Sequence, residues 1–181
     1  GNEKLEVRYN IVGLDSIKQA IIQPIENIDD INVKSNYIHK LPNISEFQFL
    51  IVNEALKTIT FKVGYWEIKK DMIIPSGYTL IATEGVNIDL KQQAKIISYS
   101  PLRFRGNEEF FVKVFSSDST GRGIAVLNAG KESILTYVIF ENLSYPPRGD
   151  FSFKGAVTFY ETVARIHGVQ FRNIRSETAL N

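Results

Sequence analysis

Basic side chains near the end of the chain have the types and the spacing to bind an anion. The stretch VARIHGV (163–169) alternates between apolar and polar residues, so Arg165 and His167 are expected together on the outward side of a strand. Arg172 follows beyond the next bend, and Tyr160 precedes the strand with an aromatic ring. Guanidinium groups bind carboxylates through paired hydrogen bonds, so these four side chains predict a ligand-binding site for an acidic sugar. The alternative, which the residues alone favour, is an ordinary charged and solvated surface.

Other kinds of chemistry find little support in the sequence. His39 and His167 stand 167 − 39 = 128 positions apart, and neither has a partner at metal-ligand spacing. The chain has no Cys, which removes thiol nucleophiles, disulfides and cysteine-ligated metals. The stretch SSDSTG (116–121) lacks the frame of a calcium loop, and STGRG (119–123) lacks the lysine of a phosphate loop and is expected to be a surface turn. We therefore predict no catalytic residue, no metal site and no cofactor.

The composition argues against nucleic acids and membranes as partners. The 181 residues carry 21 basic and 20 acidic side chains, a net charge of +1, so no overall basic field attracts nucleic acid or an anionic membrane. No apolar run approaches the roughly 18 residues that span a bilayer, so membrane insertion is not expected. The chain opens on the charged stretch GNEKLEVRYN without an initiator Met, and we expect it to be a piece of a longer protein.

The element that positions these side chains is predicted by an internal repeat. VIFENL (138–143) and VQFRNI (169–174) share one pattern, and Phe140 and Phe171 stand 171 − 140 = 31 positions apart. From residue 46 onward the chain consists of short β-prone runs, without Asn-Gly or Asp-Gly hairpin turns. Irregular repeats of short strands are typical of a stacked solenoid, which places Phe140 against Phe171 on successive coils.

Three further expectations follow from the repeat. Asn142 and Asn173 are expected to point inward at the bend and to bond to each other through their amides. A looser copy, AKIISYSPLRFRGN (94–107), is expected to place Phe104 in the position of Phe140. Trp66 is expected to close the first coil, although this ring and the tyrosines could also be sugar-stacking platforms.

The first 45 residues do not show the pattern of short repeated strands that follows them. Residues 5–13 and 17–25 alternate like two strands of a β-hairpin with a turn at 14–16, whereas a helix that begins at Asp15 or Ser16 is the alternative. Residues 26–45 are rich in Asn, Asp and Ser and are expected to be an irregular connector. The domain prediction is therefore a hairpin and connector at 1–45, followed by solenoid coils at 46–181.

The repeats GYWEIKKDMIIPSGYTLIATEGVNIDL (64–90), AKIISYSPLRFRG (94–106) and VLNAGKESILTYVIFENL (126–143) support a more specific assignment. They resemble the right-handed parallel β-helix repeats of the pectin-lyase-like superfamily, in particular its uncharacterised bacterial members. The resemblance implies an all-β fold, a right-handed single-stranded parallel β-helix. It also implies an exported or cell-surface location.

Two functions from different classes are compatible with that fold. The first is a non-enzymatic scaffold or carbohydrate-binding module that takes an acidic polysaccharide. The alternative is part of a polysaccharide lyase or glycoside hydrolase whose active residues lie mainly outside this segment. The last stretch, RSETALN (175–181), follows directly on a repeat and offers no cap. We therefore expect the isolated chain to form an end-to-end homodimer through its C-terminal coil.

Overall fold

The computed structural model describes residues 5–10, 17–22, 41–144, 155–176 and 178–181, which belong to two compact units, Gly1–Asn36 and Tyr37–Asn181. In the first unit, β1 (Leu5–Asn10) pairs antiparallel with β2 (Ile17–Ile22). This confirms the hairpin and excludes the helical alternative over residues 17–22. Most of the predicted connector, up to residue 40, lies outside the described residues.

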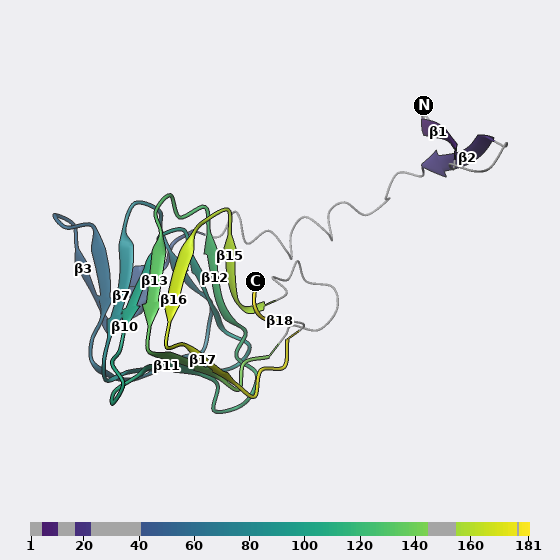
Figure 1. The fold of residues 1–181 in the computed structure, drawn as a ribbon. Coiled ribbons are helices and arrows are strands. Elements are labelled where there is room, and N and C mark those ends of the chain that lie inside the picture. The colour runs from purple at the N-terminus through teal and green to yellow at the C-terminus, as the bar shows by residue number, and fades with distance from the viewer. Residues whose placement is uncertain (1–4, 11–16, 23–40, 145–154, 177) are drawn as a thin grey trace. The chain divides into compact units, whose positions relative to one another are not determined.

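The second unit is a parallel β-helix whose coils contribute strands to three sheets (Figure 1). The first sheet consists of β3 (Leu50–Asn53), β4 (Thr58–Phe61), β7 (Thr79–Thr83), β10 (Leu102–Arg105), β13 (Ser133–Thr136) and β16 (Ala164–His167). The second consists of β5 (Gly64–Ile68), β8 (Val86–Leu90), β11 (Val112–Phe115), β14 (Val138–Glu141) and β17 (Gln170–Arg172). The third consists of β6 (Met72–Ile74), β9 (Lys95–Ser98), β12 (Gly123–Leu127), β15 (Gly155–Tyr160) and β18 (Thr178–Leu180).

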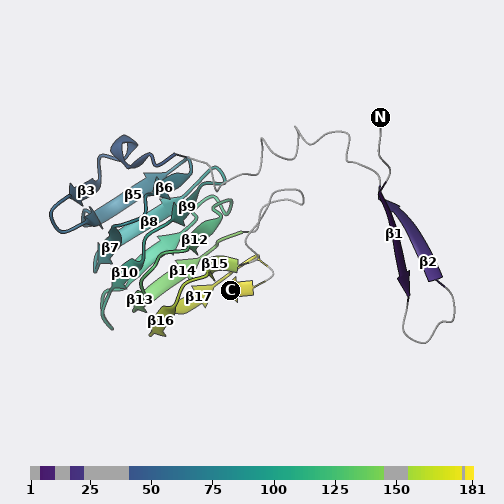
Figure 2. The same ribbon diagram turned by 90° about the horizontal axis from the view of Figure 1, so that it is seen from above.

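Neighbouring strands within each sheet come from successive coils and run parallel, as Figure 2 shows from above. The antiparallel pair β3–β4, a hairpin at the start of the unit, is the exception among the described strands of this unit. The predicted all-β parallel solenoid is therefore confirmed. Within the described residues, no helix has the length and apolar character that crossing a membrane requires.

The core lies between the three sheets, and the repeated phrase of the sequence marks one of its layers. Phe140 and Phe171 are register partners in β14 and β17, and their rings stack with centroids 5.3 Å apart at an angle of 16°. Phe140 is fully buried, while Phe171, in the last described coil, is half-buried. The predicted stacking on adjacent coils is confirmed.

The asparagine that ends each phrase occupies the bend after the strand. Asn142 and Asn173 adopt φ values of 56° and 49°, in the left-handed region that Asn tolerates better than most residues. The Asn173 amide donates to Oδ1 of Asn142 at 3.3 Å, so the predicted amide contact is present. Asn142 is half-buried, whereas Asn173, in the last described coil, is exposed, so the inward orientation of this pair stays a prediction.

The placement of Phe104 was also wrong. Phe104 lies in β10 of the first sheet, opposite Ala82 and Leu135, whereas the partner of Phe140 in the preceding coil is Val114 of the second sheet. The spacing along the second sheet is 140 − 114 = 26 residues and then 171 − 140 = 31 residues. An apolar residue flanked by outward side chains fits any of the three sheets, so pattern alone did not identify the correct one.

Aromatic side chains cover the first coil. Trp66 stacks on Phe49 with ring centroids 5.1 Å apart, and its indole N–H donates to the carbonyl of Lys62 at 2.7 Å. Asn43 accepts from the Ile73 N–H at the edge of β6, at 2.9 Å, and so satisfies a donor that an edge strand otherwise leaves open. The prediction that Trp66 closes the first coil is confirmed.

Candidate ligand-binding face

Charged residues are distributed unequally over the three sheets. The six strands of the first sheet contain no Asp or Glu. The strands of the second sheet contain three carboxylates, Glu67, Asp89 and Glu141. The first sheet instead presents basic side chains from two of its strands. The segregation means that an anion approaching the first sheet meets no strand carboxylate of its own charge.

Four side chains form what we term the basic face: Arg103 and Arg105 of β10, and Arg165 and His167 of β16. They are two residues apart along each strand, so they share the outward side, while Phe104 and Ile166 between them point to the core. The two strands are separated by β13, so the pairs lie roughly 10 Å apart along the solenoid. Arg105, Arg165 and His167 are exposed and Arg103 is half-buried.

The guanidinium groups of the basic face are largely uncommitted. In the part of the chain that the structure describes, Arg105 has no ion-pair partner, and Nη1 of Arg103 is buried without a hydrogen bond. Nη2 of Arg165 lies 3.4 Å from Oε1 of Glu132, but with 73% of the Arg165 side chain exposed this contact is weak and can rearrange. Three arginines therefore retain donors for a ligand.

Three aromatic rings in edge-to-face contact line the edge of the basic face. The His167 ring meets Tyr137 edge-to-face with centroids 5.4 Å apart, and Tyr137 meets Phe111 in the same way at 5.7 Å. The Tyr137 hydroxyl donates to Oε1 of Glu108 at 2.8 Å, and this hydrogen bond raises the pKa of the Tyr137 hydroxyl. Phe110, in the adjacent loop, is 60% exposed. Rings beside arginines provide both the stacking and the charge contacts that acidic sugars use.

The structure brings together only part of the site predicted from the sequence. Arg165 and His167 lie side by side on the first sheet. Arg172 lies on the second sheet, where it donates to Oε1 of Gln170 at 2.6 Å, and Tyr160 ends β15 of the third sheet, 54% exposed. The four residues therefore occupy three different sheets and form no single site.

Arg103 and Arg105 were missed from the sequence. The phrase R-F-R at 103–105 corresponds to R-I-H at 165–167, two coils later, and the register joins them through Ile134 and Thr136. That similarity was present in the sequence. The correspondence was missed because Phe104 was aligned with Phe140. Its true counterpart two coils later is Ile166, since both residues are register partners of Leu135.

The second sheet contains a pair of neighbouring carboxylates, the arrangement that glycoside hydrolases use for catalysis. Glu67 and Asp89 are register partners, and Lys91 pairs with Glu67 and lies 3.4 Å from Oδ2 of Asp89. Hydrogen bonds from Lys69 and Lys91 lower the pKa of Glu67 to about 2. Burial alone would raise the pKa of Asp89, but hydrogen bonds from the Tyr65 hydroxyl and from Ser117 hold it below its ordinary value. Both groups stay ionised near neutral pH, whereas a glycosidase general acid needs a raised pKa.

The bend SSDSTG is a structural corner. Asp118 accepts from the backbone N–H groups of Gln92 and Thr120, each at 2.9 Å, which joins the corners of two successive coils. Burial opposes ionisation, but these hydrogen bonds hold the pKa of Asp118 well below its ordinary value. Its carboxylate is thus occupied by the backbone, as expected for a turn.

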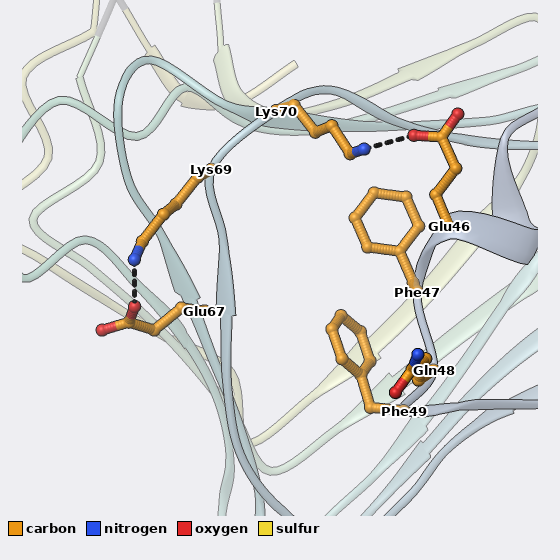
Figure 3. A pocket seen from close by; sticks show the side chains of 7 residues that line it. All are labelled: Glu46, Phe47, Gln48, Phe49, Glu67, Lys69 and Lys70. Carbon is orange, nitrogen blue, oxygen red and sulfur yellow. Dashed lines mark ion pairs between the residues drawn. The ribbon is translucent and has the colours of Figure 1, made fainter.

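A pocket of about 410 Å³ lies beside the cover of the first coil. Figure 3 shows the rings of Phe47 and Phe49 between two ion pairs, Lys70–Glu46 and Lys69–Glu67, the latter at 2.7 Å. Gln48 completes the lining. Each lysine is matched by a carboxylate, so the pocket offers no net charge and its polar groups already satisfy one another.

Comparison with known proteins gives no independent identification: no family model, no curated protein and no solved structure matches the chain. Within the described ranges, no group of three His, Cys, Asp or Glu side chains could hold a metal ion. The site is therefore defined by its own geometry, a row of basic side chains on one flat side of a parallel β-helix.

Proposed function

We propose that the chain is a non-enzymatic parallel β-helix module that binds an acidic polysaccharide through the basic face, within an exported or cell-surface protein related to the pectin-lyase-like superfamily. The observation that carries this proposal is the clustering of basic side chains on the outward side of the first sheet. The strands of the first sheet contain three arginines and a histidine but no carboxylate. A flat array of donors suits an extended polyanion better than a compact ligand, which needs a concave site.

The chemistry of the carboxylates supports a binding role over a catalytic one. Glu67 and Asp89 have lowered pKa values, and the pKa of Lys91 is raised by its hydrogen bond to Glu67. A general acid needs a raised carboxyl pKa and a lysine base needs a lowered pKa, so each shift runs opposite to the catalytic requirement. The polysaccharide lyase or hydrolase remains the second candidate, on the ground that Glu67 and Asp89 lie on adjacent strands.

A double substitution tests the binding site. In the variant with both Arg105→Gln and Arg165→Gln, we expect the affinity for fluorescently labelled hyaluronan or polygalacturonate fragments to fall roughly ten-fold or more, since two charge-assisted contacts are lost. Fluorescence anisotropy at low salt measures it. In the wild type, added salt should weaken binding steeply, and neutral dextran should not bind.

The matched control removes the same two charges from another sheet. Lys113 and Arg172 are both exposed on the second sheet, so the double variant with Lys113→Gln and Arg172→Gln should retain the wild-type affinity. Equal losses in both double variants would point to a general charge effect and contradict the proposed site. Absence of any anionic binding at low salt would contradict the proposed function itself.

A further inference from the structure

Outward residues of the first sheet alternate in character from one coil to the next. Two neighbouring rows run across the strands, and their members are fixed by the strand register. The first row reads Ile81, Arg103, Ile134 and Arg165, and the second reads Thr83, Arg105, Thr136 and His167. Coils with an Ile/Thr pair thus alternate with coils that carry a basic pair, over β7, β10, β13 and β16.

The alternation gives the basic face a spacing. Adjacent strands lie about 4.8 Å apart, so basic pairs recur roughly every 10 Å along the solenoid axis. Like charges directly opposite each other on adjacent strands destabilise a sheet, which is one physical reason to separate the basic pairs. The consequence for a ligand is that the coil between them, with Ile134 and Thr136, offers a methyl-rich surface and a hydroxyl but no cation.

We propose that the basic face recognises a linear glycan in which an anionic sugar alternates with a neutral one, lying along the solenoid axis. The inference rests on the proposed function and specifies its ligand. An extended glycan advances by about one sugar ring per strand spacing, so every second ring lies over a basic pair. The ring between them lies over Ile134 and Thr136, where its C–H groups and hydroxyls find matching partners.

A glycan with a charge on every sugar fits the face less well. Its intermediate carboxylate would lie over Ile134 and Thr136, where no cation replaces the water that it loses. Donors are available at both sides of this coil: Arg105 of β10 and Arg165 of β16 are exposed. On β10, a buried nitrogen of Arg103 also lacks a hydrogen bond among the described residues. Buried nitrogens without partners are rare, and a ligand that reorders this side chain would supply one.

Two probes of equal charge test the inference on the full chain. A hyaluronan octasaccharide carries four carboxylates on alternate sugars, and tetragalacturonic acid carries four on consecutive sugars. We expect the alternating probe to bind roughly ten-fold more tightly, because the consecutive probe must also place an intermediate carboxylate over Ile134 and Thr136, where no cation replaces its lost water. Isothermal titration at one low salt concentration measures both affinities.

A substitution in the intermediate coil separates spacing from sugar identity. Thr136→Lys places a cation between the basic pairs, so the preference for the alternating probe should shrink toward equal affinity. Thr178→Lys adds the same charge to an exposed position of the third sheet and should leave the preference unchanged. Equal affinities in the wild type, or a preference for the consecutive probe, would overturn the alternation while leaving the proposed function in place. Absence of binding by both probes would overturn the proposed function as well.

Discussion

Phe140→Ala is expected to lower the free energy of unfolding by about 3–5 kcal/mol, the loss typical of a fully buried phenylalanine. The Phe140 side chain is 0% exposed and stacks on Phe171 in the next coil. The surrounding strands belong to continuous sheets, so they have little freedom to collapse into the cavity. Urea or guanidinium unfolding followed by circular dichroism measures the change.

Two phenylalanines serve as controls for this experiment. Phe171→Ala removes the other ring of the stack but leaves a smaller cavity, since Phe171 is half-buried, and we expect a smaller loss. Phe110→Ala, at a side chain 60% exposed, should be close to neutral. A loss for Phe140→Ala that is no larger than that for Phe110→Ala would show that the second-sheet layer is not packed as described.

Gly123→Ala should also be strongly destabilising, for a backbone reason. Gly123 begins β12 with φ at +83°, and a Cβ there would lie 1.9 Å from the carbonyl oxygen of Ala156 in the next coil. The alanine must either strain its own backbone or push β15 away from β12. Strain and overpacking together are expected to cost about 2–6 kcal/mol, measured by the same unfolding experiment.

Gly77 and Gly130 separate the two contributions. Both have positive φ, +85° and +67°, but a Cβ at either position meets nothing within 4 Å. Gly77→Ala and Gly130→Ala should therefore show only the backbone cost, about 1–2 kcal/mol. If Gly123→Ala is no worse than these two, the close approach of β12 and β15 is not a feature of the folded protein.

The fold was predictable because the stacked coils of a solenoid produce a repeat in the sequence. The shared phrase around Phe140 and Phe171 reports a register that the structure reproduces, and short β-prone runs without hairpin turns indicated parallel strands. The register of earlier coils was not predictable in the same way. In the preceding coil, Val114 takes the position of Phe140, so the repeated phrase lacks its phenylalanine there. The coils also differ in length, so the repeat has no constant period.

The candidate site was predictable only in part. Alternation along one strand correctly grouped Arg165 with His167, because residues two apart share a side of any strand. Arg172 and Tyr160 were grouped with them by closeness in sequence, yet a coil that turns through three sheets sends near neighbours to different sides. Arg103 and Arg105, sixty-two residues before Arg165 and His167, join them through the strand register.

The most direct test of the basic face is to observe which arginines a bound glycan touches. In a nuclear magnetic resonance titration of the full chain with a hyaluronan octasaccharide, the Nε–Hε signals of Arg103, Arg105 and Arg165 should shift in parallel with binding. The signals of Arg122 and Arg172, which lie outside the first sheet, should stay in place. Shifts concentrated at Arg172, or binding that leaves the three first-sheet arginines unchanged, would contradict the account.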